Sequence, residues 1–115
     1  MARRLLQTVA THKGYYLSQD LMRRGEHARA AVALSVATDA WPETPNLWYN
    51  LACARARSGS RGPALDALEQ AVAVGFDDRD LMASDDDLKS LRHEARFQAL
   101  VATPGEAEAP GGPGL

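Results

Sequence analysis

Apolar side chains recur at intervals of three and four residues in four successive stretches of the chain, roughly 12–24, 26–40, 45–58 and 60–75. This spacing places the apolar side chains on one face of an α-helix, so each stretch is predicted to form an amphipathic helix. The predicted fold class is therefore all-α.

Glycine and proline mark the ends of these helices. Gly25 and Gly59 follow the first and third helices, where glycine readily closes the last turn. Trp41-Pro42 ends the second helix, because the residue before a proline avoids the α region. The fourth helix ends at Gly75. Two pairs of helices, each joined at a glycine, are expected.

The two helix pairs resemble each other at a distance of 34 residues. Ala30 and Ala64 are expected where the second helix of each pair crosses the first, since small residues let helix axes approach closely. A fixed period of this length is typical of helix–turn–helix repeats that stack into an α-solenoid. When residues 11–40 are laid over residues 45–74, the identical pairs are Tyr15/Tyr49, Leu17/Leu51, Arg23/Arg57, Gly25/Gly59, Ala30/Ala64, Ala33/Ala67, Leu34/Leu68 and Ala37/Ala71.

These ordered positions have a counterpart in a known family. They include Leu17, Ser18, Gly25, Ala30, Leu34, Ala37 and Pro42 in the first copy and Trp48, Leu51, Ala52, Gly59, Ala64, Leu68 and Ala71 in the second. In this order they resemble two tetratricopeptide repeats over residues 11–76. The chain departs from the family pattern at Gly14, Leu21, Arg55 and Phe76. The resemblance implies a fragment of an α-solenoid.

Residues 76–102 do not repeat the unit. Ser84 is predicted to be the N-cap of a helix, with Asp87 reaching back to it. Leu88, Leu91, Phe97, Leu100 and Val101 supply an apolar stripe for one or two short helices, as the cap of a solenoid requires. The segment also resembles the end-capping stretch that often follows such repeats in bacterial proteins, through Phe76-Asp77-Asp78, Asp85-Asp86-Asp87-Leu88 and Arg96-Phe97-Gln98-Ala99-Leu100.

The predicted domain organisation is one helical domain over residues 1–102 and a tail. The domain holds repeats at about 11–44 and 45–78 and a capping segment at about 79–102. Residues 103–115 contain four glycines and three prolines and have almost nothing to bury. They are predicted to be a disordered tail.

The resemblance implies a concave groove, lined by the first helix of each unit, that binds a peptide or partner protein. Each tyrosine has packing between the units as its alternative role. Asn50 stands at a position that grips the peptide in chaperone-binding relatives. A full carboxylate clamp is missing, so an acidic C-terminal tail is not the expected ligand. The implied groove residues are His12, Tyr15, Gln19 and Met22 from the first unit and Asn46, Tyr49, Asn50 and Cys53 from the second.

Charge and composition argue against several classes of partner. The net charge of −2 gives no general attraction to nucleic acid, and no aromatic platform for RNA accompanies the arginines Arg55, Arg57 and Arg61. No stretch has the length of a membrane span. The charge is uneven, however, with an excess of basic residues in 1–30 and of acidic residues in 77–94. The single cysteine and the lack of a signal peptide favour a cytoplasmic location.

A search for catalytic or metal-binding motifs points away from an enzyme. Phosphate-binding loops, nucleophile elbows and zinc-protease motifs are missing from the sequence. The three histidines are far apart, and exposed positions are expected for them. The aspartates of 77–87 lack the pattern of a calcium loop and are expected to cap helices. Cys53 is interpreted as a small core or groove residue. No cofactor and no metal are predicted.

The predicted function is that of a protein–protein interaction adaptor or scaffold, which binds a peptide or a partner helix in the groove. The alternative is a C-terminal structural or oligomerisation module of a larger protein with no ligand of its own. Two repeats are fewer than a solenoid generally needs. The missing layer is therefore supplied by the capping segment, by self-association into a homo-oligomer or by the rest of a longer protein.

Overall fold

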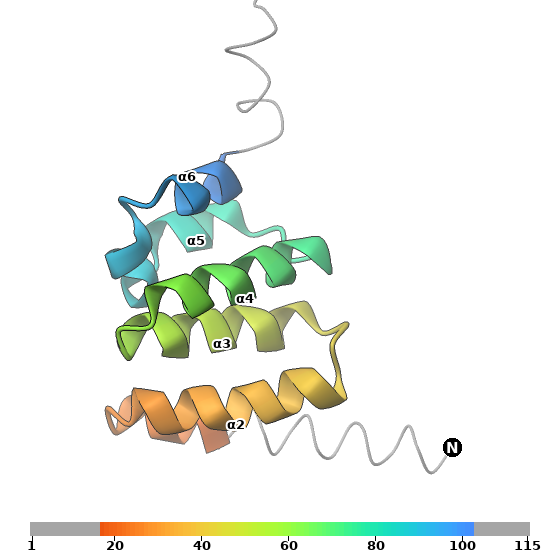
Figure 1. Ribbon diagram of the computed structural model, residues 1–115, viewed down its shortest axis with the longest axis vertical. Coiled ribbons are helices and arrows are strands. Elements are labelled where there is room, and N and C mark those ends of the chain that lie inside the picture. Colours follow the sequence, from red (N-terminus) through yellow and green to blue (C-terminus); the bar gives the residue numbers. More distant parts are fainter. Residues whose placement is uncertain (1–16, 103–115) are drawn as a thin grey trace, which may run out of the picture.

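The computed structural model describes residues 17–102, and all the regular structure in this range is helical (Figure 1). The all-α fold class is therefore confirmed. After a helical stretch at 17–23, the elements are α2 (His27–Ala40), α3 (Pro45–Arg57), α4 (Arg61–Ala73), α5 (Arg79–Ser84), the 3-10 helix η1 (Asp86–Leu91) and α6 (Ala95–Val101).

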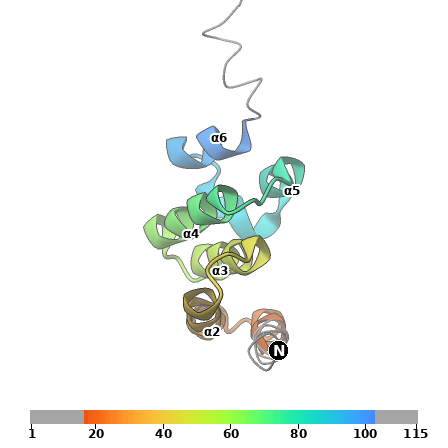
Figure 2. The same ribbon diagram turned by 90° about the vertical axis from the view of Figure 1, so that its right-hand side faces the viewer.

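The helices are stacked in layers along the long axis of the molecule (Figure 1). Helix α3 lies in the middle and packs against α2 on one side and α4 on the other. The helical residues 17–23 lie beside α2 at one end of the stack, and α5 and α6 lie at the other end (Figure 2). The 3-10 helix η1 packs mainly on α3. The C-terminal segment therefore covers the middle of the stack as well as its end.

Two turns with the same geometry join the helices at the period of the sequence repeat. Gly25 and Gly59 have φ values of 77° and 88°, a left-handed conformation that other residues adopt at a cost. In each turn the backbone N–H three residues past the helix end donates across the turn. Glu26 N–H donates to the Leu21 carbonyl and Ser60 N–H to the Arg55 carbonyl, both at 2.8 Å. These bonds satisfy carbonyls that the helix end leaves open.

The core is built from leucines and alanines at the positions that the repeat predicted. Ala30 and Ala64 are completely buried, as are Leu34 and Leu68. Alanine at these points leaves no room for a larger side chain, because protein interiors are packed as densely as organic crystals. The close approach of α2 and α4 to α3 therefore depends on small side chains.

The C-terminal segment differs from the prediction in its helix starts. Ser84 is not an N-cap: it is the last residue of α5, and its hydroxyl donates to the Asp80 carbonyl at 2.9 Å. Asp85 caps η1, and its Oδ1 accepts from the Asp87 backbone N–H at 3.0 Å. Asp87 therefore contributes its backbone to the cap and does not reach back with its carboxylate. Helix α5, which the prediction lacked, has Asp78 as its N-cap, whose side chain accepts from the Leu81 N–H.

Polar contacts fasten this segment to the rest of the chain. The Arg96 guanidinium binds Glu69 and Asp66 of α4, at 2.6 and 2.7 Å. The Arg79 guanidinium donates to the carbonyl oxygens of Leu100 and Ala102, which ties α5 to the end of α6. Helix α6 is thus held both from α4 and from α5.

Candidate interaction groove

A cavity of about 210 Å³ lies between the helical residues 17–23, α3 and the start of η1. We call it the Tyr49 cavity. Five of the eight residues that the sequence assigned to a groove line this cavity, and they come from two helices that are one repeat apart. The lining residues are Ser18, Gln19, Met22, Leu34, Tyr49, Asn50, Cys53, Asp85 and Asp87.

Of the three remaining groove residues, one lies away from this cavity and two are outside the residues that the structure describes. Asn46 is exposed near the start of α3 and does not line it. His12 and Tyr15 lie outside the residues that the structure describes. The cavity is therefore lined by Gln19 and Met22 on one helix and by Tyr49, Asn50 and Cys53 on the other.

Tyr49 is buried, and its ring does not form an exposed groove surface. Only 5% of it is exposed, and its ring stacks on Phe76 with centroids 4.3 Å apart and planes 6° from parallel. The Tyr49 hydroxyl donates to Asp85 Oδ2 at 2.6 Å. Burial, followed by the hydrogen bond to Asp85, raises the pKa of the Tyr49 phenol. Tyr49 thus holds the C-terminal segment against α3, and of its two predicted roles the structure favours packing.

Cys53 is buried as well, with 4% of it exposed. Burial raises the pKa of its thiol, and the nearby carboxylates of Asp85 and Asp87 act in the same direction. A thiol with a raised pKa is a poor nucleophile, because the thiolate is the reactive form. The chemistry of Cys53 therefore fits a packing role better than a catalytic one.

Cys53, Asp85 and Asp87 form the one group in residues 17–102 whose ligand atoms lie as a metal ion would need, within 4.8 Å of one another. Three of the four carboxylate oxygens of this group already have partners. Asp85 accepts from the Tyr49 hydroxyl and from the Asp87 N–H, and Asp87 Oδ1 lies 3.5 Å from Arg57 Nε. Burial, and then the charge of Asp85, raises the pKa of the Asp87 carboxyl. Helix capping and an ion pair explain this cluster without a cation.

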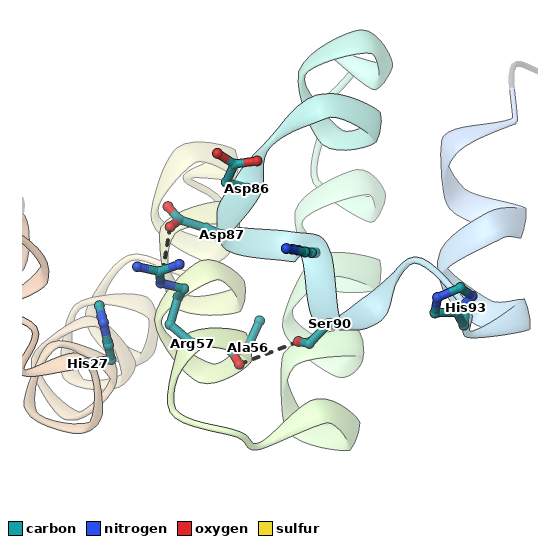
Figure 3. Close-up of a pocket in the computed structure, with 8 residues that line it drawn as sticks. His27, Ala56, Arg57, Asp86, Asp87, Ser90 and His93 are labelled. Carbon is teal, nitrogen blue, oxygen red and sulfur yellow. Dashed lines mark hydrogen bonds and ion pairs between the residues drawn. The ribbon is translucent and has the colours of Figure 1, made fainter.

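A second cavity adjoins the first, because Asp87 lines both. This cleft of about 530 Å³, which we call the Arg57 cleft, lies between the end of α3 and η1 (Figure 3). It is open, since five of its eight lining residues are exposed. Its lining residues are His27, Ala56, Arg57, Asp86, Asp87, Lys89, Ser90 and His93.

The Arg57 cleft has mixed charge. Arg57 points toward Asp87, and Ser90 bonds to the Ala56 carbonyl at 3.5 Å (Figure 3). Lys89 is exposed and makes no ion pair with any residue in 17–102. Sequence reasoning missed this cleft, because it forms only where the short 3-10 helix η1 and the turn that holds His93 pack beside the end of α3.

The histidines and the departures from the repeat pattern have structural roles here. His27 is partly buried, with Nδ1 3.3 Å from the sulfur of Met22, so the expectation that it is exposed is wrong. His93 is exposed as expected.

Two of the residues that depart from the repeat pattern have packing or hydrogen-bonding roles. Arg55 donates to the Pro63 carbonyl at 3.1 Å. Leu21 is buried.

Comparisons with protein-family models, curated proteins and solved structures gave no match to this chain. In residues 17–102, no helix combines the length and the apolar character that crossing a membrane would require.

Proposed function

We propose that this protein is a tetratricopeptide-like interaction adaptor that binds a peptide or a helix of a partner protein along the Tyr49 cavity and the Arg57 cleft. One observation carries the proposal. Five residues that the resemblance assigns to the first helices of the two units line a single cavity, and this cavity lies beside a larger cleft. The matching turns at Gly25 and Gly59 support the relation between the two units.

The groups around the two cavities are suited to binding. Gln19 and Asn50 bring side-chain amides to the Tyr49 cavity, and an amide can both donate to and accept from a peptide backbone. Lys89 and Arg57 bring positive charge to the neighbouring cleft, beside the carboxylates of Asp86 and Asp87. A ligand with one polar or small apolar side chain for the cavity and mixed charge beyond it fits this arrangement.

The size of the Tyr49 cavity favours an extended segment over a helix at that point. An α-helix with its side chains is about 10 Å wide. The cavity holds about 210 Å³ and is bordered by Asp85 and Asp87, so it is too small for a helix of that width. A single side chain enters it more readily than a helix does. The wider Arg57 cleft then receives the neighbouring residues of the ligand.

The test is a selection of peptides from a random display library on the purified full chain, followed by calorimetry with the selected sequences. Asn50→Ala and Lys89→Ala should each weaken binding about threefold to tenfold, as expected for the loss of one hydrogen bond or one exposed charge contact. Gln70→Ala is the matched control, because Gln70 is an exposed amide on α4 away from both cavities. Peptides that bind both groove variants as tightly as the wild type would contradict the proposal.

A further inference from the structure

Helix α2 has an apolar outer face that no part of residues 17–102 covers. Val32 and Val36 are 65% and 64% exposed, and Ala28 and Ala40 continue the same row at four-residue spacing and are exposed too. Residues four apart form a ridge on a helix surface. The opposite face of α2, with Ala30, Leu34 and Ala37, is buried against its neighbours. The helix therefore carries apolar residues on two opposite faces, and a helix with one covered apolar face does not need the second for the core of its own chain.

The second repeat does not share this feature. The residues 34 positions after Val32 and Val36 are Asp66 and Gln70. Asp66 pairs with Arg96 of α6, and Gln70 is exposed. The apolar ridge is therefore a property of α2 and not of the repeat pattern in general.

The exposed face of α2 is symmetric about its centre near residue 34. Reversing the helix about that point exchanges Val32 with Val36 and Ala28 with Ala40, so apolar positions meet apolar positions. The same reversal exchanges the two exposed charged residues of the helix, Arg29 and Asp39, which have opposite charges. A surface of this kind is complementary to a second copy of itself across a two-fold axis.

We propose that α2 packs antiparallel on α2 of a second copy of the chain, with Val32 and Val36 at the centre of the contact and Arg29 of each copy facing Asp39 of the other. Arg29 is 3.1 Å from Glu26 of its own chain but remains largely exposed. Asp39 has no ion pair among the described residues. The dimer pairs Asp39 and removes the valine ridge from water.

The surface beside the ridge provides room for the partner's side chains. A groove of about 240 Å³ runs between α2 and the turn from α3 to α4, and small or short residues of both line it, among them Ala31, Ser35 and Pro63. Small residues allow two helices to approach closely. None of the ridge or charged residues lines the Tyr49 cavity or the Arg57 cleft. The dimer therefore leaves the proposed binding groove open. Peptide binding and dimerisation can be tested independently of each other.

The expected association is weak. Helix α2 has 14 residues and is thus about 21 Å long. A contact centred on one helix buries less than the roughly 800 Å² per partner of a standard stable interface. Dimerisation should therefore depend on concentration and should be measurable at high protein concentration.

Sedimentation velocity on the full chain, over concentrations from about ten micromolar to about a millimolar, tests the proposal. The apparent mass of the wild type should rise with concentration, from the 12.4 kDa of one chain toward twice that mass. Val36→Lys should remain at the mass of one chain throughout. Gln70→Lys, which changes the matching position of the second repeat, should behave as the wild type does. A wild type that stays monomeric at every concentration overturns the proposal, and so does a Val36→Lys variant that still dimerises.

Charge exchange tests the antiparallel arrangement without touching the valines. R29D and D39R should each raise the dissociation constant by about threefold or more, because two like charges then face each other at both ends of the contact. The double variant R29D/D39R should restore wild-type association. A mixture of the two single variants should form heterodimers in preference to either homodimer. Equal association of all four proteins would overturn the proposed pairing of α2 with α2.

Discussion

Replacing Tyr49 by Phe removes one oxygen atom from the contact that joins α3 to the C-terminal segment. The stack of the ring on Phe76 is retained, so the change isolates the hydrogen bond from the hydroxyl to Asp85, which is 2.6 Å long. Hydrogen bonds to charged groups contribute about 1.5–3 kcal/mol. Because Asp85 is only partly buried, water can replace part of the lost contact. We therefore expect Tyr49→Phe to lower the free energy of unfolding by about 1.5 kcal/mol, at the low end of this range.

A double-mutant cycle separates this bond from the second role of Asp85. Asp85→Ala removes both the Tyr49 contact and the cap on the Asp87 N–H. Its expected cost is about 2.5 kcal/mol, the sum of about 1.5 for the bond and about 1 for the cap. The double variant should cost little more than Asp85→Ala alone, which gives a coupling energy of about 1.5 kcal/mol. Urea unfolding followed by far-ultraviolet circular dichroism measures all four proteins, provided that their m-values agree.

The pH dependence gives an independent check on the same residue. Burial raises the pKa of Tyr49 in the folded protein, whereas the unfolded value is about 10. The stability that comes from the neutral phenol is therefore complete below about pH 10 and is lost as the pH rises above it. The wild type should lose its advantage over Tyr49→Phe as the pH rises above about 10. The reasoning is refuted if Tyr49→Phe unfolds like the wild type at pH 7 or if the coupling energy is below about 0.5 kcal/mol.

Three further predictions concern the turns, the core and the C-terminal contact. Gly59→Ala should destabilise the protein by about 1 kcal/mol, because its positive φ strains any residue with a Cβ. Gly62→Ala should stabilise it by about 0.5 kcal/mol, since Gly62 lies within α4 with nothing within 4 Å of an added Cβ; thermal or urea unfolding distinguishes the two signs. Ala64→Leu should cost about 1–3 kcal/mol because the site is fully buried, whereas Ala73→Leu, at an exposed position of the same helix, should change stability by less than about 0.5 kcal/mol. Arg96→Ala should speed amide hydrogen exchange in α6, which Arg96 anchors to α4, and leave exchange in α3 unchanged; equal exchange rates in α6 would show that the contact is not needed there.

Much of the helical part of this fold was determined by local features of the sequence. Glycine, proline and the three-to-four spacing of apolar residues predicted α2, α3 and α4 to within one or two residues at each end. These signals act over a single turn of helix, so they do not depend on distant parts of the chain. The repeat also identified Ala30 and Ala64 as buried crossing points, since a small residue within an apolar face has few other uses.

The sequence also selected most of the candidate groove, but it did not determine how each residue is used. Gln19, Met22 and Asn50, which the resemblance assigns to the groove, line one cavity. The roles of Tyr49 and Cys53 depend on Asp85, which lies 36 residues after Tyr49 and fills one side of that cavity. Nothing local to α3 reveals this partner.

The C-terminal segment was decided by tertiary packing. Ser84 and Asp85 are both good N-cap residues, and local preference does not choose between them. Burial of Met82 and Leu88 on either side, together with the bond from Tyr49, fixes Asp85 as the cap and produces a short 3-10 helix. That helix in turn forms the Arg57 cleft. The sequence by itself determined the helices that carry their own start and stop signals. The tertiary structure decided the short elements, which are not stable until they pack on α3, on α4 and on one another.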